Sequence, residues 1–153
     1  MCFFWAATSK SAREYIGFDK KGGYTVDEPV RNLFLLQWRV LQQERFYEIH
    51  RFLAERNKQL AGIVSGSDRI HYLQEYLYHR ANSGEIAALP QSIKATVQRI
   101  SQENDDTFIQ FLEEFQQDRE LQETLGESNV NAVLTLLAAY QQERMRGEND
   151  DPI

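Results

Sequence analysis

Apolar residues recur at steps of three and four along the chain from residue 28 onward, which is the spacing of one face of a helix. In residues 28–41 they are frequent enough to cover most of the helix circumference, a pattern typical of a buried helix. This set comprises Val30, Leu33, Phe34, Leu36, Trp38, Val40 and Leu41. Beyond Gln42 the apolar positions narrow to a single stripe that begins with Phe46 and ends with Ile63. Pro29 suits the first turn of the predicted helix.

The predicted helix over residues 28–61 is long for a domain of this size. Its 34 residues would span about 51 Å at 1.5 Å per residue. A compact chain of 153 residues has a radius of gyration near 15 Å, hence a diameter of roughly 38 Å. The helix is therefore broken, lies in an elongated bundle or extends into a partner subunit. The change of pattern at Gln42–Gln43 is the expected position of a break or of a change of neighbours.

Four further helices follow from the apolar stripes and from the residues that start and stop helices. They are expected at about residues 68–82, 90–102, 104–125 and 128–147. Ser67 or Asp68 is the expected cap of the first of these helices, and Ser128 of the last. The last helix is expected to close near Gly147, which leaves residues 148–153 as a frayed acidic tail.

The first 26 residues have a different pattern. Two short β-prone runs, 15–18 and 24–26, flank a turn that contains two glycines, which predicts a small β-hairpin. An isolated hairpin is only marginally stable, so we expect it to pack on the helices together with the aromatic residues Phe3–Trp5. The expected organisation is thus an aromatic N-terminal segment (1–26), a helical domain (27–147) and the tail. The predicted fold class is mainly α, a single five-helix bundle-like domain with a long central helix.

Composition narrows the class of protein without identifying its activity. The chain has 153 residues, of which 42% are hydrophobic and 26% charged, in the ordinary globular range. Its single cysteine, Cys2, excludes an intramolecular disulfide framework and a Cys-rich zinc site. No stretch of about 18 apolar residues and no signal-peptide pattern is present, so we expect a cytoplasmic protein that does not enter the membrane.

Charge is unevenly distributed. Residues 1–100 hold 14 Lys and Arg against 10 Asp and Glu, a net +4, whereas residues 101–153 hold 3 against 13, a net −10; together they give the net −6 of the chain. The simpler interpretation is that most of these charges are solvated surface. The alternative is a basic face for an acidic partner, or head-to-tail self-association.

Catalytic motifs are missing from the sequence. Residues 20–23 lack the spacing of a phosphate-binding loop, and Val64–Ser67 lacks the Gly-x-Ser-x-Gly elbow of a nucleophilic serine. The Glu-x-x-His pairs of di-iron bundles are also missing. We therefore predict no catalytic residues, no cofactor and no enzymatic activity.

His71, Glu75 and His79 stand at intervals of four and could share one face of a helix. Imidazole and carboxylate groups are ligands for zinc and other first-row metals. His71 and His79 are about 12 Å apart along the helix axis, so a metal would use one adjacent pair plus a ligand from elsewhere, such as His50. The simpler interpretation of the three residues is a solvated polar face.

The leading functional hypothesis is a non-catalytic protein-interaction module, an adaptor, assembly factor or regulatory subunit, which forms a homodimer through the long helix. The tyrosines of 72–78 most commonly form the rim of a core, but tyrosine is also enriched at protein interfaces. The expected contact residues are Trp38, Phe46, Arg51, Tyr72 and Tyr76. The alternative is a domain that binds a small molecule or metal through His71, Glu75 and His79. A nucleic-acid regulator that uses Arg39–Lys58 is a weaker alternative, because the net charge is acidic.

Overall fold

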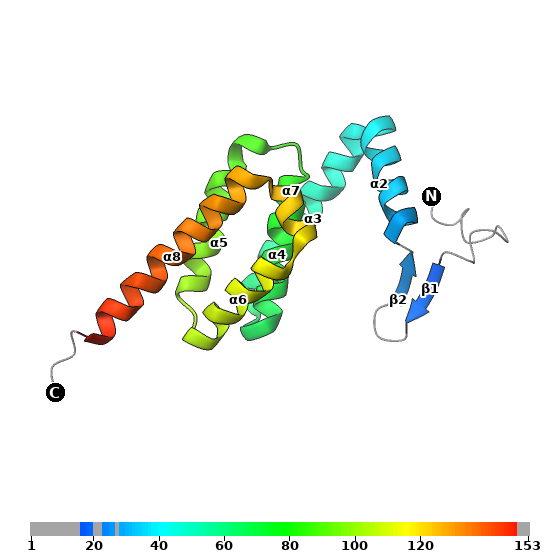
Figure 1. Ribbon diagram of the computed structural model, residues 1–153. Helices are drawn as coiled ribbons and strands as arrows, with labels where there is room; N and C mark the ends of the chain where they lie inside the picture. The colour runs from blue at the N-terminus through cyan, green and yellow to red at the C-terminus, as the bar shows by residue number, and fades with distance from the viewer. Residues whose placement is uncertain (1–15, 20–22, 27, 150–153) are drawn as a thin grey trace. The chain divides into compact units, whose positions relative to one another are not determined.

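A computed structural model of the chain describes the backbone of residues 16–19, 23–26 and 28–149, and the side chains of residues 29–146 (Figure 1). The chain divides into two compact units, residues 1–46 and 47–153, which are treated separately below. The sequence-based division into 1–26, 27–147 and 148–153 stays a prediction. The Phe3–Trp5 cluster and the last four residues of the expected tail lie outside the described residues.

In the residues that the structure describes, the first unit contains two short strands and a helix. Strands β1 (Ile16–Asp19) and β2 (Gly23–Val26) pair in antiparallel fashion, with Ile16 opposite Val26 and Asp19 opposite Gly23. Residues 20–22, where the turn is expected, lie outside the described residues. Helix α2 (Glu28–Leu41) follows, and the first turn of α3 (Gln43–Ile63) completes the unit.

A single residue, Gln42, separates α2 from α3. Backbone hydrogen bonds nevertheless continue across it: Gln42 N donates to Trp38 O over 2.8 Å, and Phe46 N donates to Gln42 O over 2.9 Å. The predicted break at Gln42–Gln43 is confirmed, and residues 28–61 do not form one unbroken helix.

Helix α2 is not the buried helix that its sequence predicts. None of its described side chains, 29–41, is buried. Its large apolar side chains are 49–70% exposed at the following positions: Leu33, Phe34, Leu36, Val40 and Leu41. The prediction was wrong because an apolar circumference shows that burial of the side chains stabilises the helix. It does not show whether the same chain or another chain buries them.

The second unit is a helical bundle. After the rest of α3 come α4 (Gly66–Ala81), the short 3₁₀ turn η2 (Ile86–Ala88), α5 (Leu89–Ser101), α6 (Asp105–Gln117), α7 (Arg119–Leu125) and α8 (Glu127–Asn149). Helix α4 packs against α5, α6 and α7, while α8 packs against α5 and α7 (Figure 1). In the described part of the chain, the most extensive helix–helix packing lies among α4–α8. The sequence predicts that residues 28–61 form the long central helix of the bundle. This prediction is wrong, because these residues form two separate helices, α2 and α3.

The core follows the predicted apolar stripes of α4–α8. Its fully buried side chains comprise Ala61, Ile70, Leu73, Leu77, Leu89, Ile93, Val97, Ile100, Phe108, Phe111, Phe115, Leu121, Leu125, Val133 and Leu137. Phe111 and Phe115 stack with ring centroids 6.2 Å apart, one turn apart on α6. Apolar burial on this scale is the dominant favourable term in folding, at about 25 cal/mol per Å².

The described residues form seven α-helices rather than the five that the sequence predicts. One additional helix arises at Gln42, and the other arises at Asp118, where the expected helix over 104–125 divides into α6 and α7. The Asp118 side chain accepts a hydrogen bond from Leu121 N over 2.9 Å and so caps α7. Gln122 Nε2 donates to the carbonyl oxygens of Phe115 and Gln116, which satisfies the last turn of α6.

The Asp118 break has a geometric reason. Phe115 and Leu121 are six residues apart, so in a continuous helix at about 100° per residue they would point about 120° away from each other. Both side chains are buried in the core. Interrupting the helix at Asp118 allows both to face it.

Three predicted helix ends also differ from the structure. The N-cap of α4 is Ser65 rather than Ser67 or Asp68, and its side chain makes no capping hydrogen bond. Helix α8 starts at Glu127, one residue before the predicted cap, and continues through Gly147 to Asn149. The glycine does not end the helix because an isolated glycine costs only about 1 kcal/mol relative to alanine.

Helices α3 and α4 form an antiparallel hairpin joined by Val64 and Ser65. Arg69 Nε donates to Ala61 O over 3.1 Å near the connection. At the far end, a Cβ on Gly84 would approach the Tyr47 ring to 2.9 Å, so the ring lies directly against the glycine backbone. Residues equally distant from the connection therefore meet along this hairpin.

Candidate functional site

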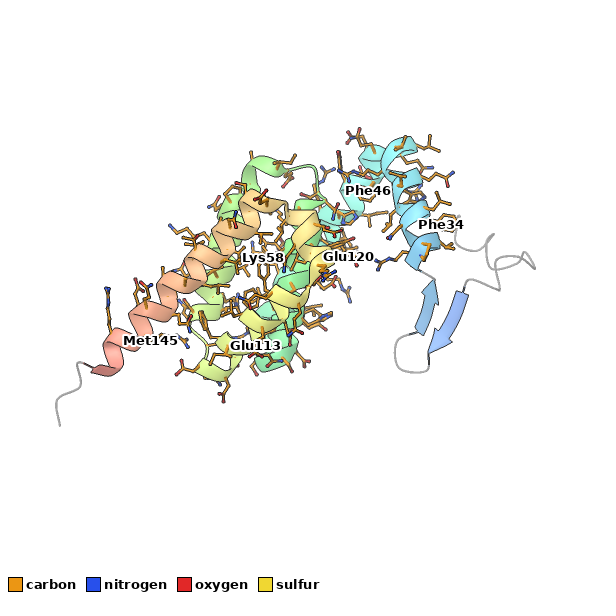
Figure 2. All side chains as sticks on the ribbon, viewed as in Figure 1. Phe34, Phe46, Lys58, Glu113, Glu120 and Met145 are labelled. Carbon is orange, nitrogen blue, oxygen red and sulfur yellow. The ribbon has the colours of Figure 1, made fainter. Side chains whose placement is uncertain are left out.

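The described side chains contain two features that the core does not explain: the exposed apolar face of α2 and a histidine contact between α3 and α4. The first lies in the N-terminal unit. Leu33, Leu36 and Val40 follow one another at steps of three and four, so they form a single stripe along the helix. Phe34, which is labelled in Figure 2, and Leu41 widen this stripe. Each follows a stripe residue directly, so it lies about 100° farther around the helix.

The two arginines of α2 lie away from this stripe. At 3.6 residues per turn, Arg31 and Arg39 point more than 100° away from the stripe that Leu33 and Val40 define, whereas the exposed Gln37 lies within the apolar face, one turn after Leu33. Helix α2 is thus amphipathic, with a broad apolar face that is exposed. We name the residues Leu33, Phe34, Leu36, Val40 and Leu41 the α2 apolar face.

The second feature joins α3 to α4. His50 Nδ1 and His79 Nδ1 lie 2.9 Å apart, within hydrogen-bond distance, and the ring centroids are 4.9 Å apart. On the other side of the His79 ring, Nε2 lies 3.3 Å from Glu75 Oε2. His50 is only 6% exposed. The Tyr78 ring borders both imidazoles, 6.1 Å from His50 and 5.3 Å from His79.

The predicted metal candidates are only partly brought together. Glu75 and His79 are in contact and His50 joins them, as the sequence suggested for a ligand from elsewhere. His71 is exposed two turns away, with its ring 5.3 Å from that of Tyr72. Among the residues that the structure describes, no three His, Cys, Asp or Glu side chains converge as metal ligands. Glu75 and His50 contact opposite nitrogens of His79, so one ion could not bind all three groups.

Of the predicted contact residues, Trp38 lies on α2 and is partly exposed, as is Arg51 on α3. Tyr72 and Tyr76 are partly buried and pack against the bundle core. The Tyr76 hydroxyl donates to Ser92 Oγ over 2.9 Å, and Ser92 Oγ donates to Ala88 O over 3.1 Å. These two tyrosines therefore have a structural role at the rim of the core, and a role in partner binding stays a prediction.

Phe46 offers a partner little surface, because its side chain is only 5% exposed (Figure 2). By contrast, sequence reasoning did not select the members of the α2 apolar face as contact residues. It counted them as core, because an apolar circumference normally indicates burial. The sequence does contain a sign that α2 differs from α3. At Gln42 the apolar positions change from covering most of the circumference to forming a single stripe, and this residue separates two helices with different surroundings.

Acidic side chains are exposed along α6, α7 and the start of α8: Asp105, Asp106, Glu113, Glu120, Glu123 and Glu127; Figure 2 labels Glu113 and Glu120 among them. Two of the acidic residues of 101–153 form ion pairs with basic residues, Asp105 with Arg144 and Glu103 with Arg69. Exposed charges of this kind are usually solvated and contribute little to stability. The basic-face and head-to-tail interpretations stay predictions.

No helix in the described residues combines the length and the apolar character needed to cross a membrane. Comparison with protein-family models, with curated proteins and with solved structures gives no match to this chain.

Proposed function

We propose that the protein is a non-catalytic helical interaction module and that the α2 apolar face binds the same face of a second copy. The observation that carries this proposal is the 49–70% exposure of five large apolar side chains on one 14-residue helix. Contiguous apolar surface of this kind on a protein surface is characteristic of interaction sites.

The spacing of the stripe favours another helix as the partner. Leu33, Leu36 and Val40 follow the three-then-four step that also forms the seam of helix pairs. A twofold axis would place this stripe against its own copy, so that each apolar side chain meets another apolar side chain. Arg39 lies outside the seam and would stay hydrated, which avoids the desolvation of charge.

The area of the face matches a weak dimer. Fully burying one large apolar side chain stabilises by about 1.5–3 kcal/mol at roughly 25 cal/mol per Å², which corresponds to about 60–120 Å². Because these side chains are 49–70% exposed, five of them on each of two copies would remove roughly 300–850 Å², below the lower limit of about 1,200 Å² for a standard interface. We therefore expect concentration-dependent association in the micromolar range.

The experiment is sedimentation equilibrium of the full chain over a range of concentrations. The mass of the wild-type protein is expected to rise from 17.9 kDa toward twice that value. Leu36→Gln should weaken association at least tenfold, because a polar amide then replaces the centre of the stripe. The matched control is Ile63→Gln, which alters a side chain that is 80% exposed on α3, outside the α2 apolar face.

Two results would contradict the proposal. One is a monomer at every concentration, and the other is equal weakening by Leu36→Gln and Ile63→Gln. Association through apolar surface should also persist at high salt, whereas head-to-tail pairing of oppositely charged regions should be lost. The location of the protein in the cytoplasm and the roles of Trp38 and Arg51 in binding stay predictions.

A further inference from the structure

The contact between His50 and His79 has a chemical property that ordinary core contacts lack. Two ring nitrogens of the same type face each other over 2.9 Å, and each can be a donor or an acceptor, depending on its protonation. A hydrogen bond between them requires a proton on one nitrogen and a lone pair on the other. The number of protons on the pair therefore decides whether the contact is attractive.

The contact with Glu75 identifies which histidine donates the hydrogen bond between the rings when both are neutral. An ionised carboxylate only accepts, so His79 Nε2, 3.3 Å from Glu75 Oε2, carries a hydrogen. Neutral His79 then has a lone pair on Nδ1. It follows that His50 Nδ1 carries the hydrogen that joins the two rings.

Uptake of one proton preserves the contact. His79 then carries hydrogens on both nitrogens, donating from Nε2 to Glu75 and from Nδ1 to His50. The hydrogen between the rings passes from His50 Nδ1 to His79 Nδ1, so His50 becomes the acceptor at Nδ1, and the added proton is taken up at His50 Nε2. The positive charge lies next to the Glu75 carboxylate, which favours this state.

Uptake of a second proton removes the contact. Both Nδ1 atoms then carry hydrogens, and two cationic rings face each other with no lone pair between them. We propose that His50 and His79 form an acid-sensitive contact that joins α3 to α4 while the pair carries at most one positive charge and opens when both rings are protonated.

The opening involves the helices as well as the side chains. His50 is 6% exposed and the His79 side chain 12%, so neither ring reaches water fully by rotation alone. At the connected end of the hairpin, Ala61 is fully buried in the core and its carbonyl accepts from Arg69. Separation in acid is therefore confined to the end of the hairpin that holds His50, with Ala61 still in place.

The described contacts of the two rings involve two further titratable groups, the Glu75 carboxylate and the Tyr78 phenol, both on α4. The His50→Asn variant described below separates the contribution of the histidine pair from that of these two groups.

The experiment is amide hydrogen exchange of the full chain at pH 7.5 and pH 5, corrected for the intrinsic effect of pH on exchange. Suppose that the open form takes up one more proton than the closed form, with the midpoint of this uptake near pH 6.5. The equilibrium constant for opening is then about 30-fold larger at pH 5 than at pH 7.5. Amides in residues 50–54 should lose protection by about that factor. Amides of α5 and α6 should change little.

His50→Asn is the decisive variant, because an amide can donate or accept at the position of Nδ1 and carries no titrating charge. It should reduce the acid effect on residues 50–54 to less than about threefold. His71→Asn, an exposed histidine on the same helix as His79, is the matched control and should leave the 30-fold effect unchanged.

The wild-type protein provides a second test that does not depend on the folding of a variant. Long-range ¹H–¹⁵N spectra of the imidazoles at pH 8 should show hydrogen on His50 Nδ1 and on His79 Nε2. The proposal is overturned by the opposite assignment, by equal acid sensitivity of the wild type and His50→Asn, or by one equivalent of zinc or copper retained at the pair.

Discussion

The guanidinium of Arg144 lies over the ring of Phe108, 4.8 Å from its centroid, and connects α8 to the turn between α5 and α6. The same side chain forms an ion pair with Asp105. It also donates to the backbone carbonyls of Ser101, over 2.7 Å, and Glu103. Ser101 is the last residue of α5 and Glu103 lies just beyond it, where helical hydrogen bonding leaves acceptors unsatisfied.

Arg144→Met should therefore destabilise the bundle by about 2 kcal/mol, since hydrogen bonds to a charged group contribute about 1.5–3 kcal/mol. Methionine keeps most of the apolar stem but loses the donors and the cation–π contact. The urea midpoint of unfolding measures the effect. Arg146→Met, an exposed arginine on the same helix, is the control and should change stability by less than about 0.5 kcal/mol. Equal effects of the two substitutions would refute this role of Arg144.

Gly84→Ala should destabilise the protein more than Gly66→Ala. Both glycines have positive φ, +80° and +61°, which costs a residue with a Cβ about 1–2 kcal/mol. Only at Gly84 would the new Cβ meet a neighbour, the Tyr47 ring at 2.9 Å. We expect a loss of about 1 kcal/mol for Gly66→Ala and about 3 kcal/mol for Gly84→Ala, measured by thermal unfolding. Equal losses would show that the ring moves aside freely.

Asp118→Ala should destabilise the protein by about 1 kcal/mol, because it removes the acceptor for Leu121 N at the start of α7. Asn104→Ala is expected to have a similar effect at the start of α6, where the Asn104 side chain accepts from Thr107 N over 2.9 Å. Glu123→Ala, exposed within α7, is the control and should have little effect. A gain in stability for Asp118→Ala would mean that α6 and α7 prefer to be continuous.

Tyr76→Phe should lower stability by about 1 kcal/mol, because it removes the hydrogen bond to Ser92 Oγ but keeps the packed ring. If this tyrosine is only part of the core rim, the same variant should leave the association constant unchanged. Tyr72→Phe, which modifies the other partly buried tyrosine of that face, should have a smaller effect on stability. A loss of association in Tyr76→Phe without a loss of stability would assign it to the interface instead.

The residues that line the core of α4–α8 could be predicted from sequence because burial there follows local periodicity. Ile70, Leu73 and Leu77 repeat at steps of three and four, and all three are buried. The pattern does not predict the break at Asp118, because the apolar positions resume at Leu121 after a six-residue step from Phe115. An aspartate followed by helix-forming residues could have been interpreted as a cap.

The burial or exposure of the α2 side chains could not be predicted in the same way. Local patterning reports that Leu33 and Leu36 are apolar, but burial is a property of the assembly that surrounds them. The histidine contact is an intermediate case. His50 and His79 are both about 14 residues from the Val64–Ser65 connection, so an antiparallel hairpin brings them to the same level. The sequence named His50 as a ligand from elsewhere, but the meeting of the two Nδ1 atoms depends on the register of packing.

The shortness of α7 has a consequence for the order of folding. A seven-residue helix lies well below the roughly 12–15 residues that an isolated helix needs to be even marginally stable in water. Leu121 and Leu125 gain their burial where α7 packs on α4 and α8. Helix formation and docking are therefore one event for this segment, and we expect it to follow the formation of α4. A conservative substitution of Leu121 should then give a folding φ-value near zero. It should raise the rate of unfolding and leave the rate of folding nearly unchanged.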